Sequence, residues 1–173
     1  MRLIPLVFVV HTACGGAVAE SPLMVQLGLT HENTERALRS HQFCLEKSSS
    51  EVAHTQQKQV FPRCQRAAAE HGDAWVVAIF DGDRLIELRR FERYSDDNRA
   101  VERWNELVGA RMKTSAPSED ALKKIKERGL LQPGTRSVKA FNAEQQGTVV
   151  GVYLLTPTPP ENASVLERVS LVQ

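Results

Sequence analysis

The strongest hydrophobic pattern in the chain is an unbroken apolar run at residues 75–80, Trp-Val-Val-Ala-Ile-Phe. A short run of this kind, rich in β-branched and aromatic residues, predicts a strand with both faces buried at the centre of a sheet. Asp81-Gly82 follows at once and indicates a hairpin turn, because glycine readily adopts the positive φ that tight turns require. Residues 85–91 then return as the partner strand, and their polar positions are expected to face water.

Helical spacing begins after this hairpin and predicts a helix that starts at residues 95–97, Ser-Asp-Asp. Its apolar stripe consists of Val101, Trp104, Leu107, Val108 and Met112. A second helix is expected to open at residues 118–120 and to end near Gly129, since glycine is common just beyond helix ends. Closer to the N-terminus, the Thr30 hydroxyl is expected to cap a shorter helix over residues 31–40.

Five further segments have the composition of strands, and they lie on both sides of the two central helices. They are residues 43–47, 59–64, 136–141, 148–155 and 165–172. Pro62 confines the second of them to an edge or a bulge, and a helix over residues 64–70 is an alternative there. The order of elements predicts an α+β fold, an antiparallel sheet of hairpins packed against two or three helices.

Residues 1–19 are typical of an export signal, with one positive charge and then an apolar run at residues 3–10 that is too short to span a bilayer. Two processing sites are possible for this signal. Residues 11–14, His-Thr-Ala-Cys, resemble a lipoprotein lipobox in which Cys14 would be lipidated. Residues 17–19, Ala-Val-Ala, form a soluble-type cleavage site. A buried N-terminal strand is the alternative to a signal.

The expected product is an exported protein, periplasmic or anchored to the outer membrane if the host is bacterial. Residues 20–26 are expected to be a tether and residues 27–173 a single domain. Cys44 and Cys64 remain as an even pair, which predicts one disulfide in an oxidising compartment. Closing a loop of about 20 residues stabilises a fold by roughly 3 kcal/mol in the chain-entropy model.

Composition and charge exclude several classes of protein. The 173 residues include 42% hydrophobic and 25% charged residues, an ordinary globular balance. The 22 basic and 21 acidic residues become equal in number once Arg2 leaves with the signal. A neutral chain lacks the clustered positive charge that nucleic acids and anionic membranes attract. We therefore expect no nucleic-acid partner, and membrane contact only through a lipid on Cys14.

Chemistry-bearing residues are present but form no pattern that predicts an enzyme. The candidate metal ligands, which match no zinc spacing, are His41, Cys44, His54 and Cys64. Residues 48–50, three serines close to His54, are interpreted as a polar loop, and no G-x-S-x-G or phosphate-binding motif occurs. The acid pairs Asp81/Asp83 and Asp96/Asp97 fit a hairpin tip and a helix start. We expect no catalytic residues, no metal and no cofactor.

Two groups of side chains are candidates for partner contacts. Four arginines on or beside the second hairpin strand form a possible interaction surface: Arg84, Arg89, Arg90 and Arg93. The alternative is a solvated strand face on which Glu87 and Glu92 balance them. Trp75 and Trp104 are possible interface anchors, but their apolar surroundings favour packing in the core.

Residues 27–30, Leu-Gly-Leu-Thr, with a short helix that carries Ala37-Leu38, resemble the opening of small exported modules of the SmpA/OmlA type. Residues 80–83, Phe-Asp-Gly-Asp, and the strands beside them are similar to the sheet of those modules, so the resemblance covers residues 27–91. The chain departs from them by inserting the helices of 95–129 and by lacking a glycine after the first helix. A related layout occurs in secreted protein inhibitors of β-lactamase.

The resemblance implies a non-enzymatic envelope module that binds another protein or assists assembly, and this is the leading functional hypothesis. The first alternative is a secreted enzyme inhibitor that inserts a loop, either 48–57 or 156–163, into its target. The second alternative is a hydrolytic or metal-dependent enzyme.

Overall fold

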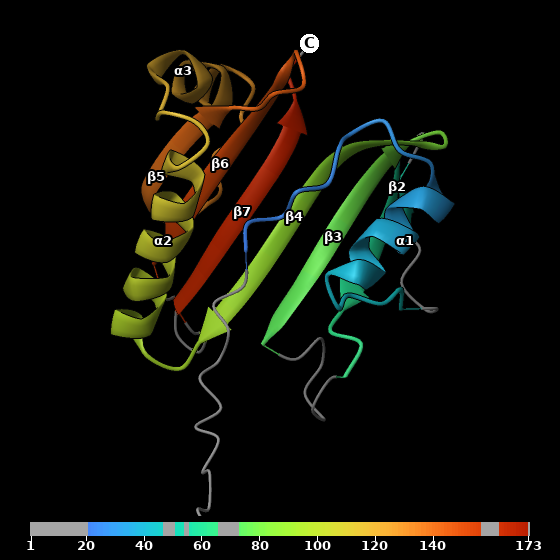
Figure 1. Ribbon diagram of the computed structural model, residues 1–173, viewed down its shortest axis with the longest axis horizontal. Coiled ribbons are helices and arrows are strands. Elements are labelled where there is room, and N and C mark those ends of the chain that lie inside the picture. The colour runs from blue at the N-terminus through green and yellow to red at the C-terminus, as the bar shows by residue number, and fades with distance from the viewer. Residues whose placement is uncertain (1–20, 47–50, 54–55, 66–72, 157–162, 173) are drawn as a thin grey trace, which may run out of the picture.

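The computed structural model describes residues 21–46, 51–53, 56–65, 73–156 and 163–172 of the chain. Within these residues, seven strands form one antiparallel sheet and three helices pack on it (Figure 1). The strands are β1 (Glu51–Ala53), β2 (Gln56–Pro62), β3 (Ala74–Asp81), β4 (Arg84–Tyr94), β5 (Thr135–Asn142), β6 (Thr148–Leu155) and β7 (Ala163–Leu171). The helices are α1 (His31–Ser40), α2 (Asp97–Met112) and α3 (Glu119–Glu127).

The strands follow the order β1-β2-β3-β4-β7-β6-β5 across the sheet. Two meanders, β1 to β4 and β5 to β7, therefore meet where β4 pairs with β7. The predicted α+β class is confirmed. β3 is an interior strand between β2 and β4, but β4 is the middle strand of the described sheet, and Trp75 and Ile79 on one face of β3 are only half-buried. The hairpin turn at Gly82 has the expected positive φ of 56°.

One strand of the sequence prediction is wrong. Residues 43–47 were expected to form a strand, but Phe43 makes only an isolated bridge to Arg63. Short edge strand β1 instead lies within the segment that the sequence predicts to be turn-like. The Cys44 and Glu46 amides each donate one hydrogen bond to one half of β2, and β1 pairs with the other half. The two segments therefore share the same edge of β2. The alternative helix over 64–70 lies largely outside the described residues.

Side chains cap all three helices where the sequence places their starts. Thr30 Oγ1 accepts the Asn33 amide, Asp96 accepts the Asn98 amide and Ser118 accepts the Ala121 amide. Each cap satisfies an amide that the first helical turn leaves without a partner. Gly129 follows α3 with a φ of +63°, as expected for a residue just beyond a helix end.

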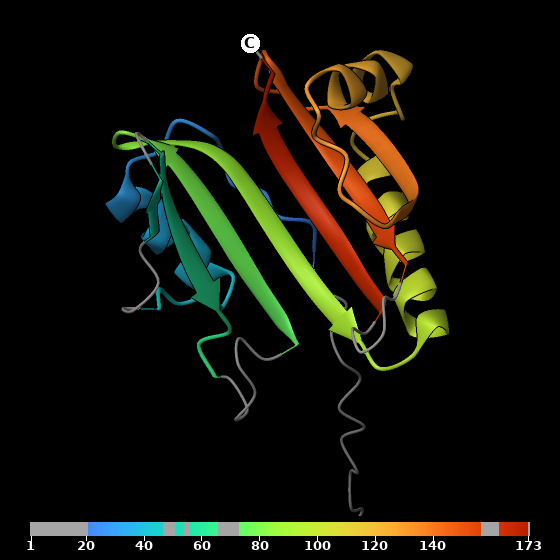
Figure 2. The same ribbon diagram turned by 180° about the vertical axis from the view of Figure 1, so that it is seen from behind.

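The two faces of the sheet carry different coverings (Figures 1 and 2). On one face, here called the helix face, α1, α2 and residues 21–29 pack on the larger apolar core. On the opposite face, here called the open face, α3 packs over β5 and β6 through Ala121 and Ile125. No described helix lies over β2, β3 and β4 on the open face, as Figure 2 shows.

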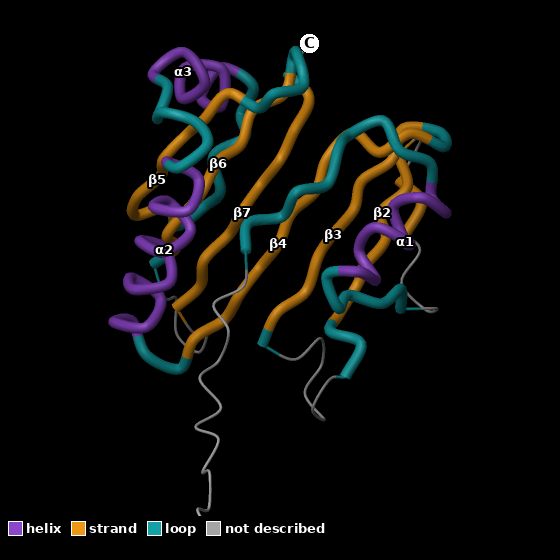
Figure 3. The backbone as a smooth tube through the Cα atoms, in the orientation of Figure 1, coloured by secondary structure: helices purple, strands orange, loops and turns teal. Residues whose placement is uncertain are grey.

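Residues 21–29 cross the helix face between α1 and α2 as an extended segment, which we call the strap (Figure 3). Leu23, Val25 and Leu27 are buried, whereas Met24 is 63% exposed. The expected tether over residues 20–26 is therefore wrong for the described part of that range. Alternating apolar side chains anchor the strap in the core, as they would anchor a strand.

Side chains satisfy the backbone at Leu23 and Leu27, whereas β4 pairs with the end of the strap, where Gly28 donates to the Leu85 carbonyl at 2.7 Å and Leu29 accepts from the Leu85 amide at 2.9 Å. Glu167 accepts the Leu23 amide at 3.0 Å, and Arg111 donates to the Leu23 carbonyl at 2.8 Å. The Gln145 amide group both accepts from and donates to the Leu27 backbone, at 3.1 and 3.2 Å. These bonds make the strap an integral part of the fold, because buried backbone groups need partners.

A chain of five buried or nearly buried charges runs beneath the strap from α2 to the sheet and back. Arg103 donates to Glu92 at 2.7 Å, and Glu92 also faces Arg90 at 3.2 Å. Arg90, only 2% exposed, faces Glu167 at 3.0 Å, and Glu167 accepts from Arg111 at 2.6 Å. We call this set the ion chain.

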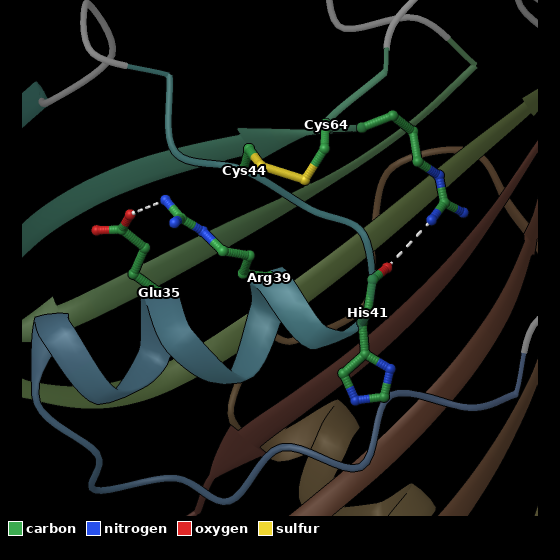
Figure 4. Close-up of a disulfide and its surroundings, with 6 residues drawn as sticks. Glu35, Arg39, His41, Cys44 and Cys64 are labelled. Atoms are coloured by element: carbon green, nitrogen blue, oxygen red, sulfur yellow. Dashed lines mark hydrogen bonds and ion pairs between the residues drawn. A yellow bond between two sulfur atoms is a disulfide. The ribbon is translucent and has the colours of Figure 1, made fainter.

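The predicted disulfide is confirmed and joins Cys44 to Cys64 across 20 positions of sequence (Figure 4). It ties the segment after α1 to the end of β2. Arg63, next to Cys64, donates to the His41 carbonyl at 3.3 Å and lies 4.2 Å above the Phe43 ring. The disulfide and the contacts of Arg63 therefore hold the segment after α1 against the end of β2.

The ion chain predicts that acid destabilises the fold. Burial alone would raise the pKa of Glu92, but the hydrogen bond from Arg103 and the charge of Arg90 outweigh it and hold that pKa below 4.5. A lowered carboxylate pKa stabilises the native state above the ordinary value, and this contribution is lost as pH falls through the native value. We expect the free energy of unfolding to drop as pH decreases below 4.5.

Urea midpoints of the parent protein and of Glu92→Gln, measured from pH 7 to pH 3, test this expectation. At pH 7 the variant should lose about 3 kcal/mol, because it removes the carboxylate that two buried arginines share, which leaves Arg90 paired with Glu167 and Arg103 with Glu106. Its curve should also be flatter in acid. The exposed control Glu102→Gln should follow the parent curve. Parallel curves for the parent and Glu92→Gln would contradict the prediction.

Candidate functional site

The uncovered part of the open face carries apolar side chains that a sheet face in water rarely shows. They belong to β2, β3 and β4, and they alternate with the core residues of the helix face. These residues are Val60, Trp75, Val77, Ile79 and Phe91. Val77 is buried, and the other four are half-buried. We call this set the apolar strip.

Trp75 and Phe91 form the centre of the strip. They are direct cross-strand partners on β3 and β4. Their rings stack at 5.1 Å between centroids with an interplanar angle of 10°. The Arg93 guanidinium lies 4.5 Å from the centroid of the Trp75 ring, in cation–π contact. The result is a layered arrangement of two rings and one cation, with Arg93 exposed.

A charged cluster borders the strip on the β7 side. Arg168 donates to Glu87 at 2.7 Å, and Arg89 donates to the same carboxylate. Ser170 Oγ also donates to Glu87, at 3.1 Å. Arg168 additionally donates to the Leu130 carbonyl at 2.7 Å, which ties the cluster to the loop after α3. One carboxylate therefore serves two guanidinium groups.

The structure divides the four arginines that the sequence groups together. Arg89 and Arg93 lie on the open face, and exposed Arg84 pairs with Asp81 in register at the hairpin turn. Arg90 points to the helix face and is buried in the ion chain, so it is not part of any exposed surface. Because successive side chains of a strand point to opposite faces, the sequence already implies that Arg89 and Arg90 cannot share one surface.

The alternative interpretation of this strand, a solvated face balanced by two acids, is also wrong. Glu87 and Glu92 are both buried, and they lie on opposite faces of β4. Sequence reasoning missed Arg168, which completes the cluster from β7. The sequence shows Arg168 only as a charged residue within an apolar strand, and nothing nearby indicates that this strand pairs with β4, which carries Glu87.

The acids that the sequence singles out have structural partners. Asp83 Oδ1 lies 2.7 Å from His31 Nδ1, and this hydrogen bond lowers the pKa of Asp83. Asp96 caps α2, and Asp97 accepts from Arg136 at 2.9 Å. Among the described residues, no three histidine, cysteine or acidic side chains gather as a metal site.

Several other candidates lie wholly or partly beyond the described residues. Cys14, the serines at 48–50 and His54 fall outside them, as do most of residues 156–163. Half of the predicted loop 48–57 is also outside them, and its described half belongs to β1 and β2. His41 is described, and its amide caps the end of α1. No helix in the described ranges is long and apolar enough to cross a bilayer.

Comparison with known proteins identifies no relative: no protein-family model, no curated protein and no solved structure matches the chain. Its function therefore has to be argued from its own residues. The open face offers aromatic rings, a cation and apolar area together, which is a composition suited to binding rather than to bond-making chemistry.

The two tryptophans should differ in their contribution to stability. Trp104 packs against the main core and donates its indole N–H to the Val152 carbonyl at 3.1 Å. Trp75 lies outside both buried clusters, contrary to the expectation of core packing. We expect Trp104→Ala to cost about 3 kcal/mol and Trp75→Ala only about 1–2 kcal/mol. Equal shifts of the urea midpoint would show that Trp75 is a core residue after all.

Proposed function

We propose that this chain is an exported, non-enzymatic domain that binds another protein through the open face. The single observation that carries the proposal is the stack of Phe91, Trp75 and Arg93 on a part of the sheet that no described helix covers. Tryptophan and arginine dominate the energetics of protein interfaces, and here they occur in contact.

The apolar strip supplies the area that such an interface needs. Antiparallel sheets that face water on one side usually alternate apolar and polar residues. On β3 the positions that alternate with the core are apolar as well, and Val60 on β2 and Phe91 on β4 widen this strip. Lys58, Glu87 and Arg89 lie beside it on the same face. Exposed apolar area bordered by charge is a recognised mark of an interaction surface. The stacked pair also loses little conformational freedom on binding, because neighbouring rings already order it.

The charges that border the strip indicate an acidic partner. Arg84 and Arg93 are exposed, and Arg89 and Arg168 share the single carboxylate of Glu87. A second copy of this face would bring like charges together, which disfavours a symmetric dimer. A partner with aspartate or glutamate around an apolar centre complements both the strip and its border.

The exported location rests on the sequence of residues 1–19, and the disulfide supports it. Disulfides persist mainly in secreted and periplasmic proteins. We therefore propose that the partner is another envelope or extracellular protein.

Site-specific photocrosslinking tests the proposal. A photoreactive amino acid replaces Val60 on the open face in one protein and exposed Arg99 on α2 in another. Each protein is irradiated with an envelope extract of the source cells. The proposal predicts a discrete crosslinked product from position 60 and none from position 99. Products from position 99 alone, or the same products from both positions, would contradict it.

The partner recovered from position 60 then allows a matched charge-reversal experiment. Arg93→Glu should weaken binding by about tenfold or more, because it removes the cation over Trp75 and repels acidic groups. Arg99→Glu makes the same change in net charge on α2 and should leave affinity within about twofold. Added salt should weaken binding of the parent protein. Equal losses in the two variants would overturn the assignment to the open face.

A further inference from the structure

A second concave site lies on the helix face, independent of the surface proposed above. It is a cavity of about 190 Å³ where the strap passes the end of α2 and the turn between β5 and β6. Phe141, Val150 and Val169 form its apolar walls within the sheet. Met24 and Arg111 border it on the outer side.

One of the residues that line the cavity carries a buried hydroxyl group without a hydrogen-bond partner in the described part of the chain. Thr148 is 4% exposed and lines the cavity, next to Val150 on the same face of β6. Its Oγ1 has no hydrogen-bond partner among the described groups. Buried hydroxyl groups nearly always have a partner, and losing one is costly. A ligand atom that bonds to this oxygen would recover that loss.

Arg111 supplies a second polar contact at the wall. Its Nε and Nη2 donate to Glu167 and to the Leu23 carbonyl. Its Nη1 faces the sulfur of Met24 at 3.6 Å, and a thioether is a weak acceptor. Glu167 is also shared with Arg90, which in turn faces Glu92, so the ion chain contains three guanidinium groups and two carboxylates and ends at the cavity with Arg111.

One charge at the cavity works against an anionic ligand. Glu144 also lines it, from the turn between β5 and β6. It is exposed, so water and salt screen its field, whereas Arg111 and Glu167 are largely shielded from solvent. The local balance therefore still favours a negative group beside Nη1 of Arg111.

We propose that this cavity binds a small apolar molecule that carries one carboxylate. The carboxylate lies between Arg111 Nη1 and Thr148 Oγ1, and the apolar part packs on Phe141, Val150 and Val169. Protein cavities of about 150 Å³ accept benzene, so one of this size accepts a ring with one small polar group. Because the strap forms part of the wall, an occupied site also holds the strap in place.

Three probes test the site in the full domain by two-dimensional NMR titration: benzoate, benzyl alcohol and acetate. Benzoate should shift the amide signals of Thr148, Gln145 and Met24 in a saturable way, with a Kd near or below about 1 mM. Benzyl alcohol should bind about tenfold more weakly, because it lacks the charge. Acetate should produce no saturable shift. Equal binding of benzoate and benzyl alcohol, or shifts at other residues, would overturn the proposal.

Matched variants separate a binding role from a structural one. Thr148→Val keeps the shape of the side chain and should weaken benzoate binding by about three- to tenfold. Thr34→Val is the control, because Thr34 on α1 is also buried with an unsatisfied Oγ1 but does not line the cavity. Unchanged affinity in Thr148→Val, or equal losses in both variants, would overturn the proposed contact.

A charge placed at the mouth of the cavity gives a second readout that does not disturb the core. Met24 is exposed, so Met24→Glu should fold normally and put a carboxylate beside Arg111. This variant should lose benzoate binding by about tenfold or more, because the new group competes for Nη1. The control is Leu131→Glu, at an exposed position that does not line the cavity. Full binding in Met24→Glu would contradict the anion site.

Discussion

The pairing of β4 with β7 joins the two meanders of the sheet, and buried charge specifies it on both faces. On the helix face, Arg90 and Glu167 are direct cross-strand partners. On the open face, Arg89 stands opposite Arg168, and Glu87 bridges them. A slip of one residue would turn one of the two strands over relative to the other and leave buried charges without partners. Such a chain adds little to net stability, but it permits only one register.

The same charges decide what each face can do. On the helix face, Glu167 and Arg111 bind the backbone of the strap, so this face becomes a closed core with one small cavity at its end. On the open face, the charges stop at the border of the apolar strip. Helix α3 covers the β5 and β6 side, and the aromatic stack remains at the other side. Binding to another protein is the use that best fits this asymmetry.

Local pattern was sufficient to predict much of the fold. The apolar run of β3, the turn at Gly82, the caps of α2 and α3 and the extent of β6 all follow from neighbouring residues. The even pair of cysteines that remains after the predicted export signal was enough to predict the disulfide. The functional side chains were harder to predict, because their roles depend on long-range pairing. Alternation along β4 places Arg90 and Arg93 on opposite faces, but nothing local shows which face is covered, and in the structure Arg90 is buried and Arg93 is exposed.

The strap shows the same limit. Residues 21–26 are predicted to be a tether despite the apolar Leu23 and Val25, because nothing nearby shows that Glu167 and Arg111 will bind their backbone. Similarly, Trp75 has the apolar neighbours of a core residue, and only the positions of the helices show that none of the described helices covers its face. The resemblance to SmpA/OmlA modules and the export of the chain remain predictions.

The most direct test of the central claim, that the open face is accessible and cationic, is quenching of Trp75 fluorescence. Trp104→Phe leaves Trp75 as the single tryptophan, because the chain contains two. At low ionic strength, and relative to a free tryptophan reference, iodide should quench this residue more strongly than caesium. The reason is that Arg89 and Arg93 attract anions to the face. Stronger quenching by caesium, or no quenching by either ion, would contradict the account.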